Sequence, residues 1–146
     1  IKSRFLELYA DMPDAIYGML HPRLVSCSFE QRSMEAVVYT QPWMRNSNHV
    51  VHGGVIATIL DSIGGATLHC FMPLGSTAPT VSLQISYLKP VPLDAPLHVR
   101  GTITQAGKNL LYVRTEAFHP DDPTHVYATG SGVHFIQNLK GPESHG

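Results

Sequence analysis

The sequence predicts an α+β fold in which an antiparallel sheet of about five to six strands wraps around one long central helix. Segment 55–71 is apolar on nearly every side of a helix, which is typical of a buried helix. Runs with strand character lie before and after it, and turns rich in Pro, Gly and Asp separate them. At 146 residues, the chain suits a single domain.

An N-terminal helical segment is expected over residues 1–20. Residues 3–10 carry apolar side chains at helical spacing, and Pro13 ends that helix. A second short helix is expected at 14–20, before Pro22.

The main domain is expected to occupy residues 21–138, with a flexible tail at 139–146. Two strands are expected to form a hairpin before the central helix, and the others follow the helix. The segments expected as strands are 23–29, 34–40, 80–88, 97–105, 110–118 and 125–136.

The central helix is expected to begin at Gly53 or Gly54. Gly64 and Gly65 in its middle each cost roughly 1 kcal/mol of helix propensity relative to Ala. We therefore expect another segment to pack very close to these two glycines.

The composition limits the partners of the chain. Charged residues make up 14% of it and its net charge is −1, and so few charges indicate that a second subunit covers part of the surface. The basic residues are scattered, so no nucleic-acid partner is expected.

Cys27 and Cys70 are isolated, which is typical of reduced thiols in a cytoplasmic protein. No stretch approaches the roughly 20 apolar residues of a membrane span.

The stretch His52-Gly53-Gly54 places backbone donors at the start of the helix. The first N–H groups of a helix have no intrahelical acceptor, and the helix dipole makes that end positive. Glycine lets a ligand approach the backbone closely. These features favour an oxyanion hole, although glycines before a helix also occur in tight turns without any chemistry.

Asp61 is a carboxylate in the middle of the apolar helix, where it is costly to bury unpaired. The small residues around it form one stripe, which suggests a cleft or a close neighbour, and an aspartate there can act as a general base or a nucleophile. The alternative is an aspartate on the exposed face, or one tied to Ser62 or an arginine. Gly53 and Asp61 are about 12 Å apart along the helix axis. If both act in one reaction, they must come from two chains of a dimer related by a two-fold axis.

The spacing of these residues resembles a known family. Asn46, the HGG stretch, Asp61 and the later segment TVSLQISYLKP resemble the hotdog-fold acyl-CoA thioesterases of the phenylacetate-pathway type, over roughly residues 20–137. The resemblance implies a hotdog fold, hydrolysis of acyl-CoA to free acid and CoA, and homodimers that pair as dimers of dimers. It implies no cofactor and no metal.

The resemblance also assigns roles to residues. Asp61 would activate water or attack the thioester, and the Gly53 N–H would be the main oxyanion donor. Asn46 would hold the thioester carbonyl or the water, His52 would orient the loop, and Thr80 would position the water. Both residues also have a purely structural interpretation: Asn46 would stabilise the turn, and Thr80 would pair with a residue of the neighbouring strand.

The expected substrate-binding residues are His49, Gly54, Lys89 and Lys108. His49 departs from the relatives, which usually carry Gly at this position. Together with His52 it forms an H-x2-H pair, which is only a weak indication of a metal site. The cations considered for the CoA phosphates are Lys89, Arg100, Lys108 and Arg114.

Three alternatives remain open from the sequence. One is a non-catalytic module that binds acyl-CoA with the same fold. Another is a hotdog hydratase or dehydratase, although the motifs of those enzymes are not found in this chain. The third is a structural oligomerisation domain, in which Asp61 would face no cleft.

Overall fold

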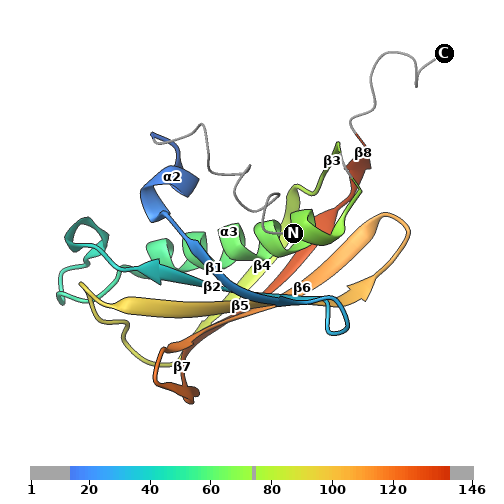
Figure 1. Cartoon of the computed structure of the whole chain (residues 1–146). Helices are drawn as coiled ribbons and strands as arrows, with labels where there is room; N and C mark the ends of the chain where they lie inside the picture. Colours follow the sequence, from blue (N-terminus) through green and yellow to red (C-terminus); the bar gives the residue numbers. More distant parts are fainter. Residues whose placement is uncertain (1–13, 74, 139–146) are drawn as a thin grey trace.

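The computed structural model describes residues 14–73 and 75–138 of the chain (Figure 1). The helix expected at 3–10 and the tail expected at 139–146 lie outside these residues. The elements follow in the order α2 (Ile16–Leu20), β1 (Arg23–Ser28), β2 (Ser33–Tyr39), η1 (Pro42–Met44), α3 (Gly53–Phe71), β3 (Ser76–Thr77), β4 (Thr80–Tyr87), β5 (Pro96–Ala106), β6 (Leu110–His119), β7 (Asp122–Phe135) and β8 (Gln137–Asn138).

The main sheet has six antiparallel strands in the order β1-β2-β5-β6-β7-β4, and it curves around α3 (Figure 1). This confirms the predicted α+β architecture, the hairpin before the helix and the strands after it. The short helix expected at 14–20 is also present, as α2. The small sheet β3-β8 was not predicted, because strands of two residues carry no periodicity.

Helix α3 forms the core together with the inner face of the sheet. Side chains on its sheet-facing side, such as Ile59, Leu60 and Ile63, are completely buried. Among the described residues, α3 alone has the length and hydropathy of a membrane span. No such stretch was expected from the sequence. Since 56% of that window is buried inside the domain, α3 has the burial of a core helix.

The two glycines in the middle of α3 differ in their surroundings. A Cβ on Gly64 would lie 3.3 Å from Val113, so the expected close packing is confirmed there. A Cβ on Gly65 would meet nothing within 4 Å, so no described segment of the same chain packs there, and close packing by a second subunit stays a prediction. Gly65 instead lines an open cavity of about 370 Å³. A further close contact was not expected: a Cβ on Gly101 of β5 would overlap the hydroxyl of Thr67.

Strand β4 is the last strand of the sheet and pairs only with β7 among the described strands. Its other edge carries backbone N–H and C=O groups that a further strand can pair with. All eight of its side chains are exposed or only partly buried. Val81, Tyr87 and the following Leu88 are more than half exposed, which is unusual for large apolar side chains gathered on one edge.

Candidate functional site

The N-terminus of α3 is held by the side chain of the residue before it. His52 adopts an extended backbone and caps the helix, since its Nδ1 accepts a hydrogen bond of 2.9 Å from the Gly54 N–H. The neutral His52 ring must then carry its proton on Nε2, which can donate to a ligand. The N–H of Gly54, a residue predicted to bind substrate, is occupied by this bond.

The Gly53 N–H is the first donor of the helix and has no acceptor within it. The peptide that follows is fixed from the sheet, because the Tyr87 hydroxyl donates a hydrogen bond of 2.7 Å to the Gly53 carbonyl. A Cβ on Gly53 would lie 3.4 Å from the Tyr87 ring. Tyr87 was missed as a site residue, although it belongs to the quoted YLKP segment, because nothing in the sequence pairs it with Gly53.

The loop before the helix is a tight turn built on Asn46. Its Oδ1 accepts hydrogen bonds from the N–H groups of Asn48 (2.8 Å) and Val50 (3.2 Å). The turn role of Asn46 is thus present, and its side-chain NH₂ is the group left to donate to a ligand. His49 is exposed and has φ 61°, the left-handed region that favours glycine. A glycine would adopt this backbone conformation more easily than His49 does.

Asp61 lies on the partly exposed stripe of α3 and is tied to the edge strand. The Thr80 hydroxyl donates a hydrogen bond of 2.8 Å to Asp61 Oδ1. The alternative in which Asp61 is held by Ser62 is not seen, since Ser62 is buried and Thr80 supplies the bond.

His134, which the sequence did not single out, supports the same strand. It is 1% exposed, and its Nδ1 lies 2.9 Å from the carbonyl of Ala78, so this nitrogen carries the proton and donates. His134 also lies opposite Thr80 in the register of β4 and β7. The chain that leads into Thr80 is therefore fixed from the core.

Tyr17 of α2 lies within range of the charge of Asp61. Burial raises the pKa of the Tyr17 phenol above its ordinary value, and the negative charge of Asp61 raises that pKa further. Asp61 thus interacts with Thr80 of β4 through a hydrogen bond and with Tyr17 of α2 through its charge.

A cavity of about 370 Å³ opens beside the start of α3, and we call it the Lys89 cavity. Its lining includes Asn46, Gly53, Tyr87 and Lys89. Lys108 does not reach it, because it lies in the β5–β6 turn beside Leu111, which packs on the far end of α3. Within one chain, the structure therefore brings Lys89, but not Lys108, to the helix N-terminus.

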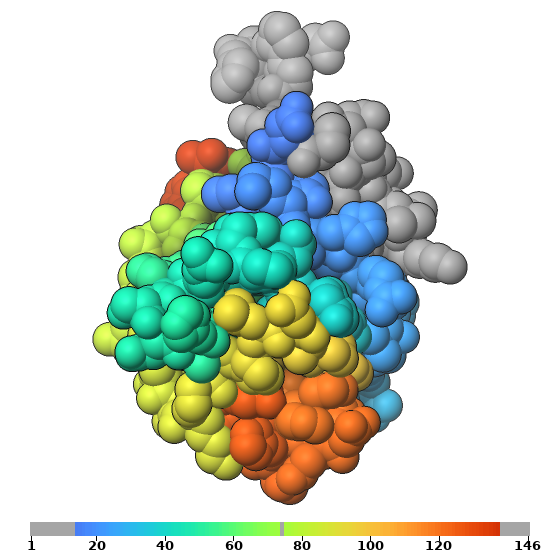
Figure 2. Space-filling model, turned by 90° about the vertical axis from the view of Figure 1, so that its left-hand side faces the viewer, coloured from blue at the N-terminus to red at the C-terminus, as the bar shows by residue number. Residues whose placement is uncertain are grey.

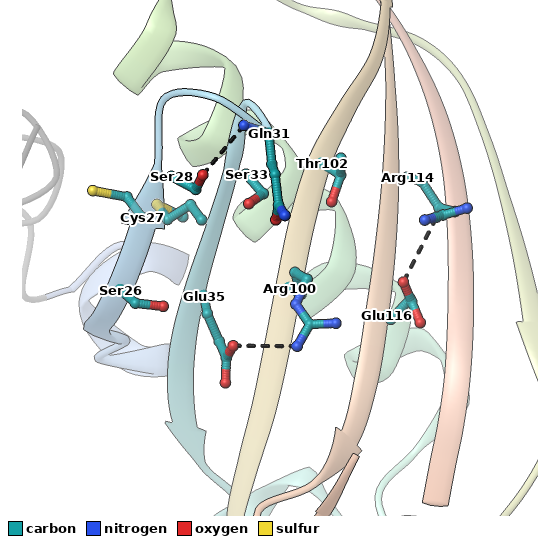
Figure 3. Close-up of a pocket in the computed structure, with 11 residues that line it drawn as sticks. Ser26, Cys27, Ser28, Gln31, Ser33, Glu35, Arg100, Thr102, Arg114 and Glu116 are labelled. Carbon is teal, nitrogen blue, oxygen red and sulfur yellow. Dashed lines mark hydrogen bonds and ion pairs between the residues drawn. The ribbon is translucent and has the colours of Figure 1, made fainter. Parts of the chain in front are cut away.

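The two arginines considered for the CoA phosphates lie in a different place. They line a polar hollow of about 740 Å³ on the outer face of the sheet (Figure 3). Arg100 contacts Glu35 at 3.4 Å, and Arg114 contacts Glu116 at 3.6 Å. Both positive charges are paired with carboxylates, which disfavours a role in binding phosphate there.

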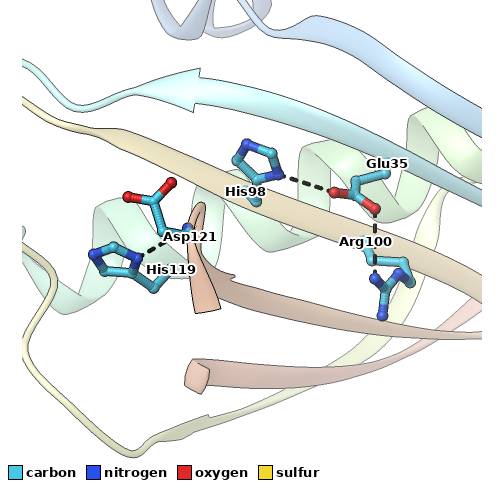
Figure 4. Close-up of polar contacts among 5 residues, drawn as sticks. All are labelled: Glu35, His98, Arg100, His119 and Asp121. Carbon is cyan, nitrogen blue, oxygen red and sulfur yellow. Dashed lines mark hydrogen bonds and ion pairs between the residues drawn. The ribbon is translucent and has the colours of Figure 1, made fainter. Parts of the chain in front are cut away.

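The Glu35 pair extends to a histidine on the same face (Figure 4). His98 Nδ1 lies 2.9 Å from Glu35 Oε1, and the Arg100 guanidinium lies 5.0 Å from the centre of the Phe118 ring. Among the described residues, which include His49 and His52, no group of three or more His, Cys, Asp or Glu side chains is arranged to hold a metal ion.

The comparisons with known proteins agree with the fold described above. The model of the thioesterase superfamily matches residues 48–125, more than half of the chain. A phenylacetic acid degradation-related protein from Ralstonia eutropha JMP134 superposes with a TM-score of 0.78 at 19% identity, over 90% of this chain and 98% of that one. The PaaI protein of the phenylacetic acid degradation operon of E. coli gives a TM-score of 0.78 at 16% identity, over 92% and 91%.

A third structure carries a ligand. A protein from Bacillus halodurans solved with CoA has a TM-score of 0.64 at 29% identity, over 70% of this chain and 66% of that one. Together these matches confirm the hotdog fold and the resemblance to thioesterases of the phenylacetate-pathway type.

Proposed function

Because the chain belongs to the thioesterase superfamily, we propose that it hydrolyses acyl-CoA to free acid and CoA at composite sites between two subunits. The observation that carries this proposal is the position of two groups at opposite ends of one edge strand. Thr80 at the start of β4 holds Asp61, and Tyr87 at the end of β4 holds the peptide of Gly53.

A second copy of the chain would complete the site through β4. If β4 pairs antiparallel with β4 of the partner about a two-fold axis near Leu83 and Gln84, each Thr80 lies opposite the partner's Tyr87. Asp61 of one subunit then lies next to the Gly53 N–H of the other. The free edge and exposed side chains of β4 support this mode of pairing, and the low charge content of the chain agrees with it.

The reaction would use these groups as follows. The thioester carbonyl oxygen accepts a hydrogen bond from the Gly53 N–H at the positive end of α3, which stabilises the negative charge of the tetrahedral intermediate. Asp61 of the partner subunit takes a proton from water, and the resulting hydroxide forms the new C–O bond. The C–S bond breaks, and the CoA thiolate leaves. Thr80 positions the carboxylate of Asp61 for this step.

The loop residues would bind and orient the substrate. The Asn46 side-chain NH₂ in the wall of the Lys89 cavity and the His52 Nε2–H beside Gly53 are donors that can contact the carbonyl or the thioester sulfur. Lys89 would contact the CoA phosphates. The exposed His49 lies on the loop that precedes α3. Gly54 would contribute only space near the carbonyl, because its N–H is bonded to His52.

Release of free thiol from a panel of aryl- and alkyl-CoA substrates tests this proposal. We expect turnover by the wild type and a loss of ~10²–10⁴-fold in kcat for Asp61→Asn, with a small change in apparent affinity. If acyl-CoA raises the melting temperature and no thiol appears with any substrate, the protein is a binding module and not a thioesterase. Mass spectrometry of Asp61 in the presence of substrate separates a general base from a nucleophile, since only a nucleophile becomes acylated.

A further inference from the structure

A second cavity lies against the first turns of α3, and we call it the Trp43 cavity. It measures about 230 Å³ and is lined by Ile16, Met19 and Leu20 of α2, Trp43 of η1, and Val55 and Thr58 of α3. Figure 2 shows α2 directly beside the segment that contains η1 on this end of the molecule. Helix α2, to which the reaction above assigns no role, therefore forms one wall of this cavity.

The two cavities lie on opposite sides of the helix N-terminus. Gly53 and Ile56 line the Lys89 cavity, whereas Val55 and Thr58 line the Trp43 cavity. Val55 follows Gly53 by two residues, and Thr58 follows Ile56 by two residues. Two residues correspond to a rotation of roughly 200° around a helix of 3.6 residues per turn. The first turns of α3 therefore separate a cavity that contains a lysine from one that contains no charged residue.

The walls of the Trp43 cavity are apolar and tied together. The indole N–H of Trp43 donates to Gln41 Oε1 at 3.1 Å, and Gln41 Nε2 donates to the Met19 carbonyl at 3.0 Å, so one glutamine joins η1 to α2. The hydroxyl of Thr58 is already used, since it donates to the Gly54 carbonyl at 2.8 Å. Trp43 is 49% exposed and Met19 45%, so these side chains offer apolar surface that a ligand can cover.

We propose that the Trp43 cavity receives the acyl group of the thioester, and that Trp43 and Met19 set the size of the acyl group accepted. This inference rests on the proposed function. With the carbonyl on the Gly53 N–H, CoA lies on the side of Lys89 and the acyl group lies on the side of Trp43. The cavity beside Gly65 is a poorer choice, because polar groups of His69, Thr77 and Gln137 line it and it lies towards the other end of α3.

The size and chemistry of the cavity define the substrate class. Its volume is below the roughly 300–1,000 Å³ of sites that enclose a whole ligand, so it suits only part of one. It offers no charged group and no free hydroxyl to a polar tail. The acyl groups expected are therefore uncharged, apolar and of short or medium length, and an acyl group that ends in a carboxylate is disfavoured because its charge would lose water without gaining a partner.

The test compares kcat/KM over straight-chain acyl-CoAs of increasing length, with succinyl-CoA as the charged member. Trp43→Ala enlarges the cavity, so we expect the preferred chain to lengthen and kcat/KM for the longest chains to rise by ~10-fold relative to the shortest. Met19→Trp fills the cavity and should shift the preference to shorter chains. Phe29→Ala, at a 70% exposed aromatic in the β1–β2 turn, is the control and should keep the wild-type profile. Wild-type profiles in both cavity variants would overturn the proposal.

A binding measurement separates this inference from the proposed function. Calorimetry with thioether analogues of the same acyl-CoAs, which cannot be hydrolysed, gives the affinity gained per added methylene. If the wild type releases no thiol but Trp43→Ala changes that gain, the acyl cavity stands and the hydrolase assignment fails. If thiol is released and the affinity gained per methylene is the same in wild type, Trp43→Ala and Met19→Trp, the cavity assignment is wrong and the hydrolase function still holds.

Discussion

Thr80 donates a 2.8 Å hydrogen bond to Asp61, so the first residue of the edge strand and the middle of the central helix form one unit. Thr80 is exposed at the free edge of the sheet, and the segment that leads into it is held by buried His134 through the carbonyl of Ala78. The orientation of the carboxylate thus depends on a strand that is also the proposed subunit interface. This link makes the assignment of Asp61 testable without changing Asp61 itself.

Replacing Thr80 by Val should lower kcat by about 10- to 100-fold, because hydrogen bonds to charged groups contribute about 1.5–3 kcal/mol. Thr80→Ser keeps the hydroxyl and is the matched control, which should retain most of the rate. Both are measured by thiol release, with sedimentation to check the oligomeric state. Equal rates in the Val and Ser variants would show that Thr80 does not position Asp61.

The electrostatic interaction between Asp61 and Tyr17 predicts a change in pKa that spectroscopy can measure. Burial is the larger cause of the raised pKa of Tyr17, and the Asp61 charge is the second. In Asp61→Asn that second cause is absent, so the pKa of Tyr17 should fall and still remain above its ordinary value. Titration of ¹³C-labelled tyrosines by NMR measures it, with Tyr17→Phe to assign the signal. An unchanged pKa in Asp61→Asn would place α2 away from Asp61.

Thr115 is the one described residue with a buried side-chain oxygen that has no hydrogen-bond partner. It is 3% exposed and lies between Gly64 of α3 and Gly130 of β7. Thr115→Val removes the unsatisfied hydroxyl and keeps the shape, so the free energy of unfolding should rise by about 1 kcal/mol. Denaturant unfolding measures this. Thr67→Val, whose wild-type hydroxyl donates to the Ile63 carbonyl, is the control and should give no gain; a loss in Thr115→Val would contradict the prediction.

The sequence predicted the main elements because their signals are local. The apolar helix beginning near Gly53 and the alternating strands are visible as periodicity within single segments. Asp61 was predicted as a site residue from its place in the apolar helix and Thr80 only through a resemblance, and their direct hydrogen bond was not predicted. Contacts between distant segments leave no periodic signal, so the bond between Tyr87 and Gly53, the buried His134 and the cavity closed by Trp43 emerged only from the structure.

The Gly53 donor can be removed with little change to the helix. Proline lacks an N–H and is favoured at the first helical position, and His52 already has the extended backbone that precedes a proline. Gly53→Pro should therefore keep the fold and lower kcat by ~10²–10³-fold, the usual loss for one oxyanion donor. Gly53→Ala adds a Cβ at 3.4 Å from Tyr87 but keeps the N–H, so it measures the effect of bulk alone. Similar rates in the Pro and Ala variants would remove the Gly53 N–H from the mechanism.

The same variant tests whether the site is shared between subunits. In a mixed dimer of Gly53→Pro and Asp61→Asn chains, one site combines the intact Gly53 of one chain with the intact Asp61 of the other. After unfolding and refolding equal amounts together, half of the dimers are mixed and each has one working site, so about a quarter of the wild-type activity should return. The two variants refolded separately and then combined at once provide the control, and they should stay inactive. Because a site built within one chain could not be restored by mixing, activity that stays at the level of the single variants would rule out the composite site.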